Sequence, residues 1–138
     1  MTATALSNAS TAPSSTSTAP SSTARLLQLD GVLCAAMGLA ISVGAGPVAE
    51  VLGSPATGVV RLVGIALVVY GVDLLAASRS RWAAQALRIA GFGNLGWEVA
   101  SLAVAAFADL STTGRVLVAV QGVAVGALGV VQLRAGRR

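Results

Sequence analysis

The chain has 138 residues, of which 55% are hydrophobic and only 10% are charged, and its net charge is +4. These polar groups are too few to cover the surface of a soluble globular protein of this size. The composition therefore predicts a membrane protein. All 9 basic residues are Arg, and neither Lys nor His is present. This excludes His-based nucleophilic dyads, a P-loop lysine, Schiff-base chemistry and His-ligated metals, and we expect no enzyme, no cofactor and no metal site.

Residues 1–24 carry no charged side chain and consist mainly of Ser, Thr, Ala and Pro, with the sequence STAPSST occurring twice in succession. Such a segment cannot bury a core, so it predicts a disordered N-terminal tail ahead of a transmembrane domain at 25–138. A secretory signal needs a basic start and a transit peptide is rich in Arg, and the tail has neither feature.

The first apolar segment, at about 26–45, is long enough for the roughly 20 residues that span a bilayer. Small residues, including Gly31 and Gly38, share one face of it and predict close packing against another helix. Glycines and Pro47 end the segment, and a brief interfacial helix is expected at 47–52.

The second segment, at about 57–77, carries Gly64 and Gly71 on one face, with Arg61 near its start and Asp73 near its end. The residues SRSRW then interrupt the apolar pattern with two Arg and an interfacial aromatic.

The third segment, at about 83–107, holds Asn94, Trp97 and Glu98 near its middle, and a stripe of small and polar residues starts near Gly91. The summed insertion free energy is close to zero, because a central charge costs about +2.5 to +3.5 kcal/mol. This helix should therefore depend on its neighbours, with the polar stripe facing protein.

The fourth segment, at about 115–133, has no internal charge and places Gly122, Gly126 and Gly129 on one stripe. The stripe predicts packing against a helix of the same subunit or of a second copy. The predicted fold is therefore all-α, a bundle of four transmembrane helices.

The arginines predict the orientation of the bundle. With four spans, one side of the membrane receives Arg25, Arg79, Arg81, Arg88, Arg134, Arg137 and Arg138, and the other receives only Arg61 and Arg115. By the positive-inside rule both termini should be cytoplasmic, in a bacterial inner (plasma) membrane. The charge is thus assigned to topology and lipid headgroups, and no nucleic-acid partner is expected.

Polar residues inside a membrane are expensive and often functional. The candidate polar core consists of Asp30, Arg61, Asp73, Arg88, Asn94, Trp97 and Glu98. Either these residues form neutralised clusters that fix helix packing, which we favour, or some of them relay a proton or solute. Depth along the helices predicts one specific contact, a buried ion pair between Arg61 and Glu98.

Two features of the sequence, a glycine motif and a single cysteine, are expected to have structural rather than chemical roles. GFGNLG, at 91–96, matches the dinucleotide fingerprint G-x-G-x-x-G, but no strand precedes it. The single cysteine, Cys34, cannot form an internal disulfide and is expected to be a packing residue.

The order of four loose motifs resembles a family of short four-helix bacterial membrane proteins. They are LLxLD-G at 26–31, GP-x-A-x-x-LG-x-P at 46–55, R-x-x-G-x-x-L-x-x-Y-G at 61–71, and GN-x-x-W-x-x-AS at 93–101. The family has no established biochemical activity, so the resemblance implies architecture and a polar core rather than a reaction.

Small multidrug resistance transporters are also short four-helix proteins, but they use a membrane-embedded Glu in the first helix. Here the first helix has only Asp30, near its expected cytoplasmic end. The favoured function is therefore a structural or accessory membrane subunit, with the lipid bilayer and a second copy or another membrane protein as partners. The alternative is a small proton-coupled transporter that uses Glu98 or Asp30.

Overall fold

The computed structural model describes residues 21–137, and within that range it contains helices and no strand. The helices are α1 (Ser22–Val43), α2 (Ala45–Leu52), α3 (Thr57–Ala77), α4 (Ala83–Phe107) and α5 (Thr112–Ala135). The predicted all-α architecture is confirmed, and α2 is the brief helix expected after the first span. The predicted tail lies mostly outside the described residues, apart from its last positions, which belong to α1.

Two helices begin earlier than expected because serines cap them. The Ser21 hydroxyl accepts a hydrogen bond from the Ala24 amide at 3.3 Å, and the Ser111 hydroxyl accepts one from the Gly114 amide at 3.0 Å. Each bond satisfies an amide that has no partner within the first turn of the helix. α1 therefore starts at Ser22 rather than near residue 26, and α5 starts at Thr112 rather than at residue 115.

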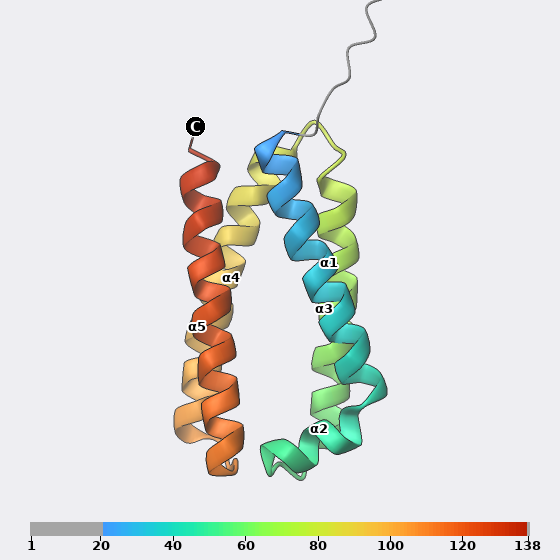
Figure 1. Cartoon of the computed structure of the whole chain (residues 1–138), viewed down its shortest axis with the longest axis vertical. Coiled ribbons are helices and arrows are strands. Elements are labelled where there is room, and N and C mark those ends of the chain that lie inside the picture. The colour runs from blue at the N-terminus through green and yellow to red at the C-terminus, as the bar shows by residue number, and fades with distance from the viewer. Residues whose placement is uncertain (1–20, 138) are drawn as a thin grey trace, which may run out of the picture.

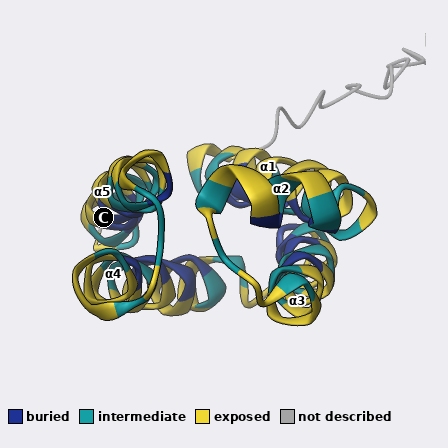
Figure 2. Ribbon diagram, turned by 90° about the horizontal axis from the view of Figure 1, so that it is seen from below, coloured by how far each residue is buried: buried dark blue, intermediate teal, exposed yellow. Residues whose placement is uncertain are grey.

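The four long helices are arranged as two antiparallel pairs, α1 with α3 and α4 with α5 (Figures 1 and 2). Contacts between the pairs are far fewer and run mainly through α1 and α4. The apolar residues Leu27, Leu74, Leu87 and Ala90 form a core where the pairs meet.

Glycines allow close approach in the α1–α3 pair. A Cβ atom at Gly31 would lie 2.8 Å from the Gly71 carbonyl oxygen, and one at Gly38 would lie 2.7 Å from the Val68 amide nitrogen. Gly64 in turn faces Ser42 and Gly38. Since real Cβ atoms are not found so close to backbone, these positions require glycine for the helices to touch.

The α4–α5 pair uses glycines in a similar way. A Cβ atom at Gly129 would lie 2.7 Å from the Gly91 carbonyl oxygen. Gly122 faces the Ser101 side chain, and Gly126 faces the Glu98 side chain. The glycine stripe of the fourth span therefore packs within its own subunit.

The two pairs are related by an internal repeat. Gly31 and Leu27 of α1 correspond to Gly91 and Leu87 of α4, each 60 positions further on. In α3 and α5 the corresponding residues are 58 positions apart: Gly64 and Gly122, Ala66 and Ala124, Gly71 and Gly129, Val72 and Val130, Leu75 and Leu133. The contacts repeat as well, because Leu75 packs against Gly31 as Leu133 packs against Gly91. Each pair is thus one copy of a glycine-packed helical hairpin.

The end of the bundle opposite the described chain ends is joined through α2. Gly53 ends this helix in a left-handed conformation, with φ of 66°, and its α-carbon lies against Ser111. The Ser111 amide donates to the Leu52 carbonyl at 2.9 Å, and its hydroxyl donates to the Val51 carbonyl at 3.1 Å. These bonds tie α2 to the start of α5.

All four long helices are long and apolar enough to cross a membrane. Large apolar residues are mostly on the outside, while buried positions are dominated by glycine, alanine and a few polar residues. This distribution is the reverse of that in a soluble bundle and is compatible with a multi-pass membrane protein.

Candidate functional site

Three buried polar side chains meet where the two helix pairs touch. Asp30 is 2% exposed, Asn94 4% and Gln132 0%. The Asn94 amide group donates to Asp30 Oδ2 at 3.0 Å and to Gln132 Oε1 at 2.9 Å, and the Gln132 amide group donates to Asp30 Oδ2 at 2.7 Å. We call these three residues the polar cluster, a closed triangle that joins α1, α4 and α5.

Glycine contacts position the members of the polar cluster. Asp30 directly precedes Gly31, where α1 touches α3. Asn94 follows Gly91 by three residues, and Gln132 follows Gly129 by three, so both amides lie about one turn from the point where α4 touches α5. The backbone contacts therefore fix the height at which the polar side chains meet.

The internal repeat produces this cluster only once. The position equivalent to Asp30 is occupied by Ala90, that of Asn94 by Cys34, and that of Gln132 by Leu74. Leu74 and Ala90 are buried and Cys34 is half-buried, so the equivalent positions carry two apolar side chains and one thiol. The hairpins thus share a backbone arrangement but differ in the chemistry of their facing surfaces.

Two more polar groups adjoin the cluster. The Cys34 thiol donates to Asp30 Oδ1 at 3.5 Å, one helical turn along α1. The Tyr70 hydroxyl of α3 is buried, finds no hydrogen-bond partner among residues 21–137, and lies next to Gly93 of α4. It is also close enough to Asp30 and Cys34 to interact with them electrostatically.

The cluster has no cationic member. No ion pair occurs within the part of the chain that the structure describes, and the donors to Asp30 are two amides and a thiol. Neutral donors can satisfy a buried carboxyl group, and a low-dielectric site strengthens each of these bonds.

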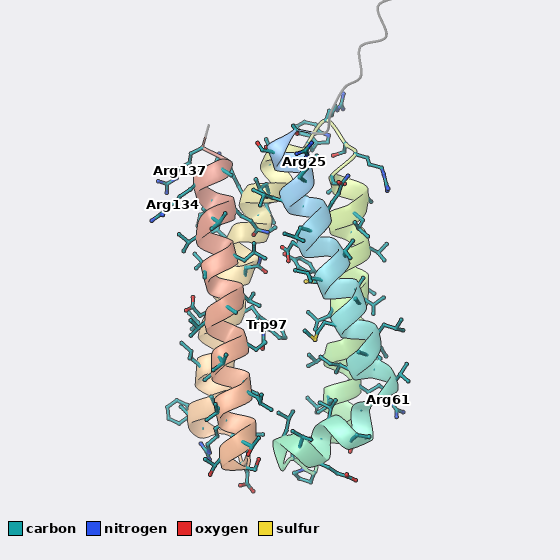
Figure 3. All side chains as sticks on the ribbon, viewed as in Figure 1. Arg25, Arg61, Trp97, Arg134 and Arg137 are labelled. Carbon is teal, nitrogen blue, oxygen red and sulfur yellow. The ribbon has the colours of Figure 1, made fainter. Side chains whose placement is uncertain are left out.

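The seven candidates of the polar core separate in space. Asp30 and Asn94 come together, while Arg61, Asp73 and Arg88 are exposed. The Arg88 side chain lies against Gly136 at the end of α5. Trp97 is half-buried and points from α4 into the space between the two pairs (Figure 3). Asp30 is eight residues inside α1, about 12 Å from its start, which is deeper than the single turn expected.

The expected ion pair between Arg61 and Glu98 is not formed, and that prediction is wrong. Arg61 lies on the outside of the α1–α3 pair (Figure 3), whereas the Glu98 carboxylate packs over Gly126 of α5. Depth along a helix follows from the sequence, but the directions in which the side chains point depend on which helices pair. Since α4 pairs with α5, Glu98 faces that neighbour instead of α3.

Sequence reasoning also missed Gln132, the most buried member of the cluster. Gln132 is neutral, so it has no charge that would single it out in an apolar segment. Its position, three residues after Gly129 on the glycine stripe of an otherwise apolar helix, was the available signal.

No group of three or more His, Cys, Asp or Glu residues that could hold a metal ion occurs between residues 21 and 137. Two surface hollows lie beside the first half of α4, where Gln85 and Ile89 line both and Phe92 lines one, and neither includes a member of the cluster.

Comparison of the chain with protein families, curated proteins and solved structures found no match.

Proposed function

We propose that this protein is a non-enzymatic, multi-pass protein of a bacterial plasma membrane that serves as a structural or accessory subunit. The observation that carries the proposal is the closed polar cluster, in which a 2% exposed carboxyl group is bonded to two amides from the other helix pair. A site of this kind locks two hairpins together. A transport site must instead become accessible from each side of the membrane in turn.

The polar cluster lies at the interface between the two helix pairs, where the helices make the fewest contacts. Within each pair, glycines bring the backbones into contact, but between the pairs the contacts are few. Hydrogen bonds between side chains of neighbouring helices specify such an interface in an apolar environment, where alternative partners are scarce. Asp30, Asn94 and Gln132 therefore set the register of one hairpin against the other.

A second candidate is a small proton-coupled transporter that uses Asp30. Two observations favour it: no cation neutralises Asp30 among residues 21–137, and the nearby Tyr70 hydroxyl is buried without a partner. A buried acid next to an unsatisfied hydroxyl is a feature that proton pathways share. Glu98 of α4, the other acid considered, instead packs over Gly126 of α5.

The two functions are separated by a proton-flux measurement. The purified protein would be reconstituted into liposomes containing a pH-sensitive dye, and the response to an acid pulse would be recorded for the wild type, Asp30→Asn and protein-free liposomes. The structural proposal expects both proteins to match the protein-free liposomes. A flux in the wild type that Asp30→Asn abolishes would overturn it in favour of transport.

The proposed orientation places both termini in the cytoplasm. Arg25, Arg134 and Arg137 lie at one end of the bundle and Arg61 lies towards the other (Figure 3), an asymmetry that supports the positive-inside assignment. Single cysteines at positions 50 and 80, in a Cys34→Ala background, would be labelled with a membrane-impermeant thiol reagent in intact cells. Labelling at position 50 alone is expected. Labelling at position 80 alone would contradict the proposed orientation and show the opposite one.

A further inference from the structure

Glu98 places a carboxyl group deep within a membrane-spanning helix. It lies fifteen residues from the start of α4 and nine from its end, so it is well inside the roughly 30 Å apolar core of a bilayer. It is half-buried, packs over Gly126, and has no hydrogen-bond or ion-pair partner within the described chain. Lipid chains cannot supply a hydrogen bond, so this group needs a partner from outside the described chain.

Apolar side chains flank Glu98 on both α4 and α5. On α4, Leu95 and Leu102 lie on its stripe, three residues before and four after it. On α5, Val123 and Val130 lie on the stripe of Gly126 in the same way. Leu102 and Val123 are 42% and 51% exposed. We call Leu95, Glu98, Leu102, Val123 and Val130 the Glu98 face.

No arginine within the described chain serves Glu98. Arg115 is held at the end of α4 by bonds from its guanidinium to the carbonyls of Ala105, Ala106 and Ala108. Arg61 of a second copy could meet the Glu98 face only head to tail. The Arg61 α-carbon lies about 8 Å nearer than the Glu98 α-carbon to the membrane surface at which α3 begins. The Arg61 side chain leans towards that surface and so away from the depth of Glu98, since side chains point towards the start of their own helix.

We propose that the Glu98 face is the interface of a symmetric dimer, in which Glu98 of one copy is hydrogen-bonded to Glu98 of the second. A two-fold axis along the membrane normal places every residue at the same depth as its symmetry mate, so the two carboxyl groups meet without any mismatch. Two carboxyl groups in contact share a proton, because both cannot be ionised at once, and the shared proton supplies the hydrogen bond that lipid cannot.

The internal repeat explains why this face, and not its counterpart on the other hairpin, is used. Gly38 and Val68 occupy the positions equivalent to Glu98 and Gly126. The counterpart surface on α1 and α3 therefore has no carboxyl group at this height, and the Ser42 hydroxyl at the position equivalent to Leu102 donates to the Gly38 carbonyl of its own helix. One hairpin faces a second copy and the other faces the bilayer.

The dimer is tested by comparing wild type, Glu98→Gln and Glu98→Leu in liposomes, with subunits counted by single-molecule photobleaching at increasing dilution. Gln can both donate and accept, so Glu98→Gln should remain dimeric, whereas Glu98→Leu should dimerise at least about tenfold more weakly. A monomeric wild type at all dilutions, or a Glu98→Leu dimer as stable as the wild type, would overturn the proposal. In either case Glu98 would be left facing lipid or a different protein.

A crosslinking experiment leaves Glu98 intact and so does not depend on the folding of those variants. In a Cys34→Ala background, Val99→Cys places a thiol beside the Glu98 face at a residue that is 68% exposed. The matched control, Val69→Cys on α3, replaces a valine that is 57% exposed on the other hairpin. Oxidation in membranes should crosslink the first and not the second, and equal crosslinking of both would contradict the proposed interface.

Discussion

Removal of one amide from the polar cluster tests whether the cluster locks the two hairpins. Gln132→Leu deletes the 2.7 Å bond to Asp30 Oδ2 and the acceptor for Asn94 at 2.9 Å. A bond to a carboxylate contributes about 1.5 to 3 kcal/mol and a neutral one about 1 kcal/mol. Leucine at 132 copies its repeat partner Leu74 and recovers some packing, so we expect a net loss of about 2 to 3 kcal/mol in the free energy of unfolding.

Replacement of the whole cluster should be much less harmful than removal of one member. In the triple variant Asp30→Ala, Asn94→Val and Gln132→Leu, no member of the polar cluster remains as a buried polar group without a partner, and only the weak Cys34 donor loses its acceptor. Two of these changes copy the equivalent residues of the repeat, Ala90 and Leu74. Apolar replacement of a complete buried network is often neutral, so the triple variant should lie within about 1.5 kcal/mol of the wild type.

The assay is unfolding in mixed micelles by increasing SDS, followed by tryptophan fluorescence. The matched control is Gln121→Leu on α5, where the glutamine is partly exposed and makes no side-chain hydrogen bond within residues 21–137. If Gln132→Leu were no more harmful than Gln121→Leu, the cluster would not act as a lock. A triple variant as unstable as the sum of its single changes would refute the reasoning about unsatisfied groups.

Three further predictions concern the packing of the helices and their ends. Gly71→Ala should lower the free energy of unfolding by about 1 to 3 kcal/mol, since its Cβ would meet the Gly31 carbonyl, whereas Gly58→Ala has no atom within 4 Å and should change little in the same SDS titration. Ser111→Ala loses both the cap of α5 and the side-chain bond to α2, so it should cost about 1 kcal/mol and increase amide hydrogen exchange in α2. Arg115→Leu removes three bonds to carbonyls at the end of α4 and should increase exchange in the last turn of that helix, and an unchanged exchange rate would show that water already satisfies those carbonyls.

The sequence was sufficient for the elements of the fold. Four uncharged or nearly uncharged runs, separated by Gly, Pro and Arg, define four spans, and α3 and α4 have the bounds expected. Periodicity also identified the glycine stripes, because small residues at spacings of three and four share a helix face whatever that face meets. Local capping was the exception: Ser21 and Ser111 moved two helix starts.

Only the tertiary structure decided which faces meet. Periodicity assigns Gly31 and Gly91 to small faces, but it does not say that Gly31 contacts Gly71 while Gly91 contacts Gly129. The pairing of α4 with α5 turned Glu98 towards Gly126 and away from Arg61, so an ion pair inferred from depth alone was not formed.

The polar cluster could not be predicted from the sequence for the same reason. Asp30 and Gln132 are 102 positions apart, and a neutral Gln in an apolar helix carries no charge signal that would link it to a distant acid. A residue's own helix determines its height and direction, which the sequence encodes locally. Whether its hydrogen bonds are satisfied depends on the rotation and pairing of whole helices, and these are set by backbone contacts at glycines far along the chain.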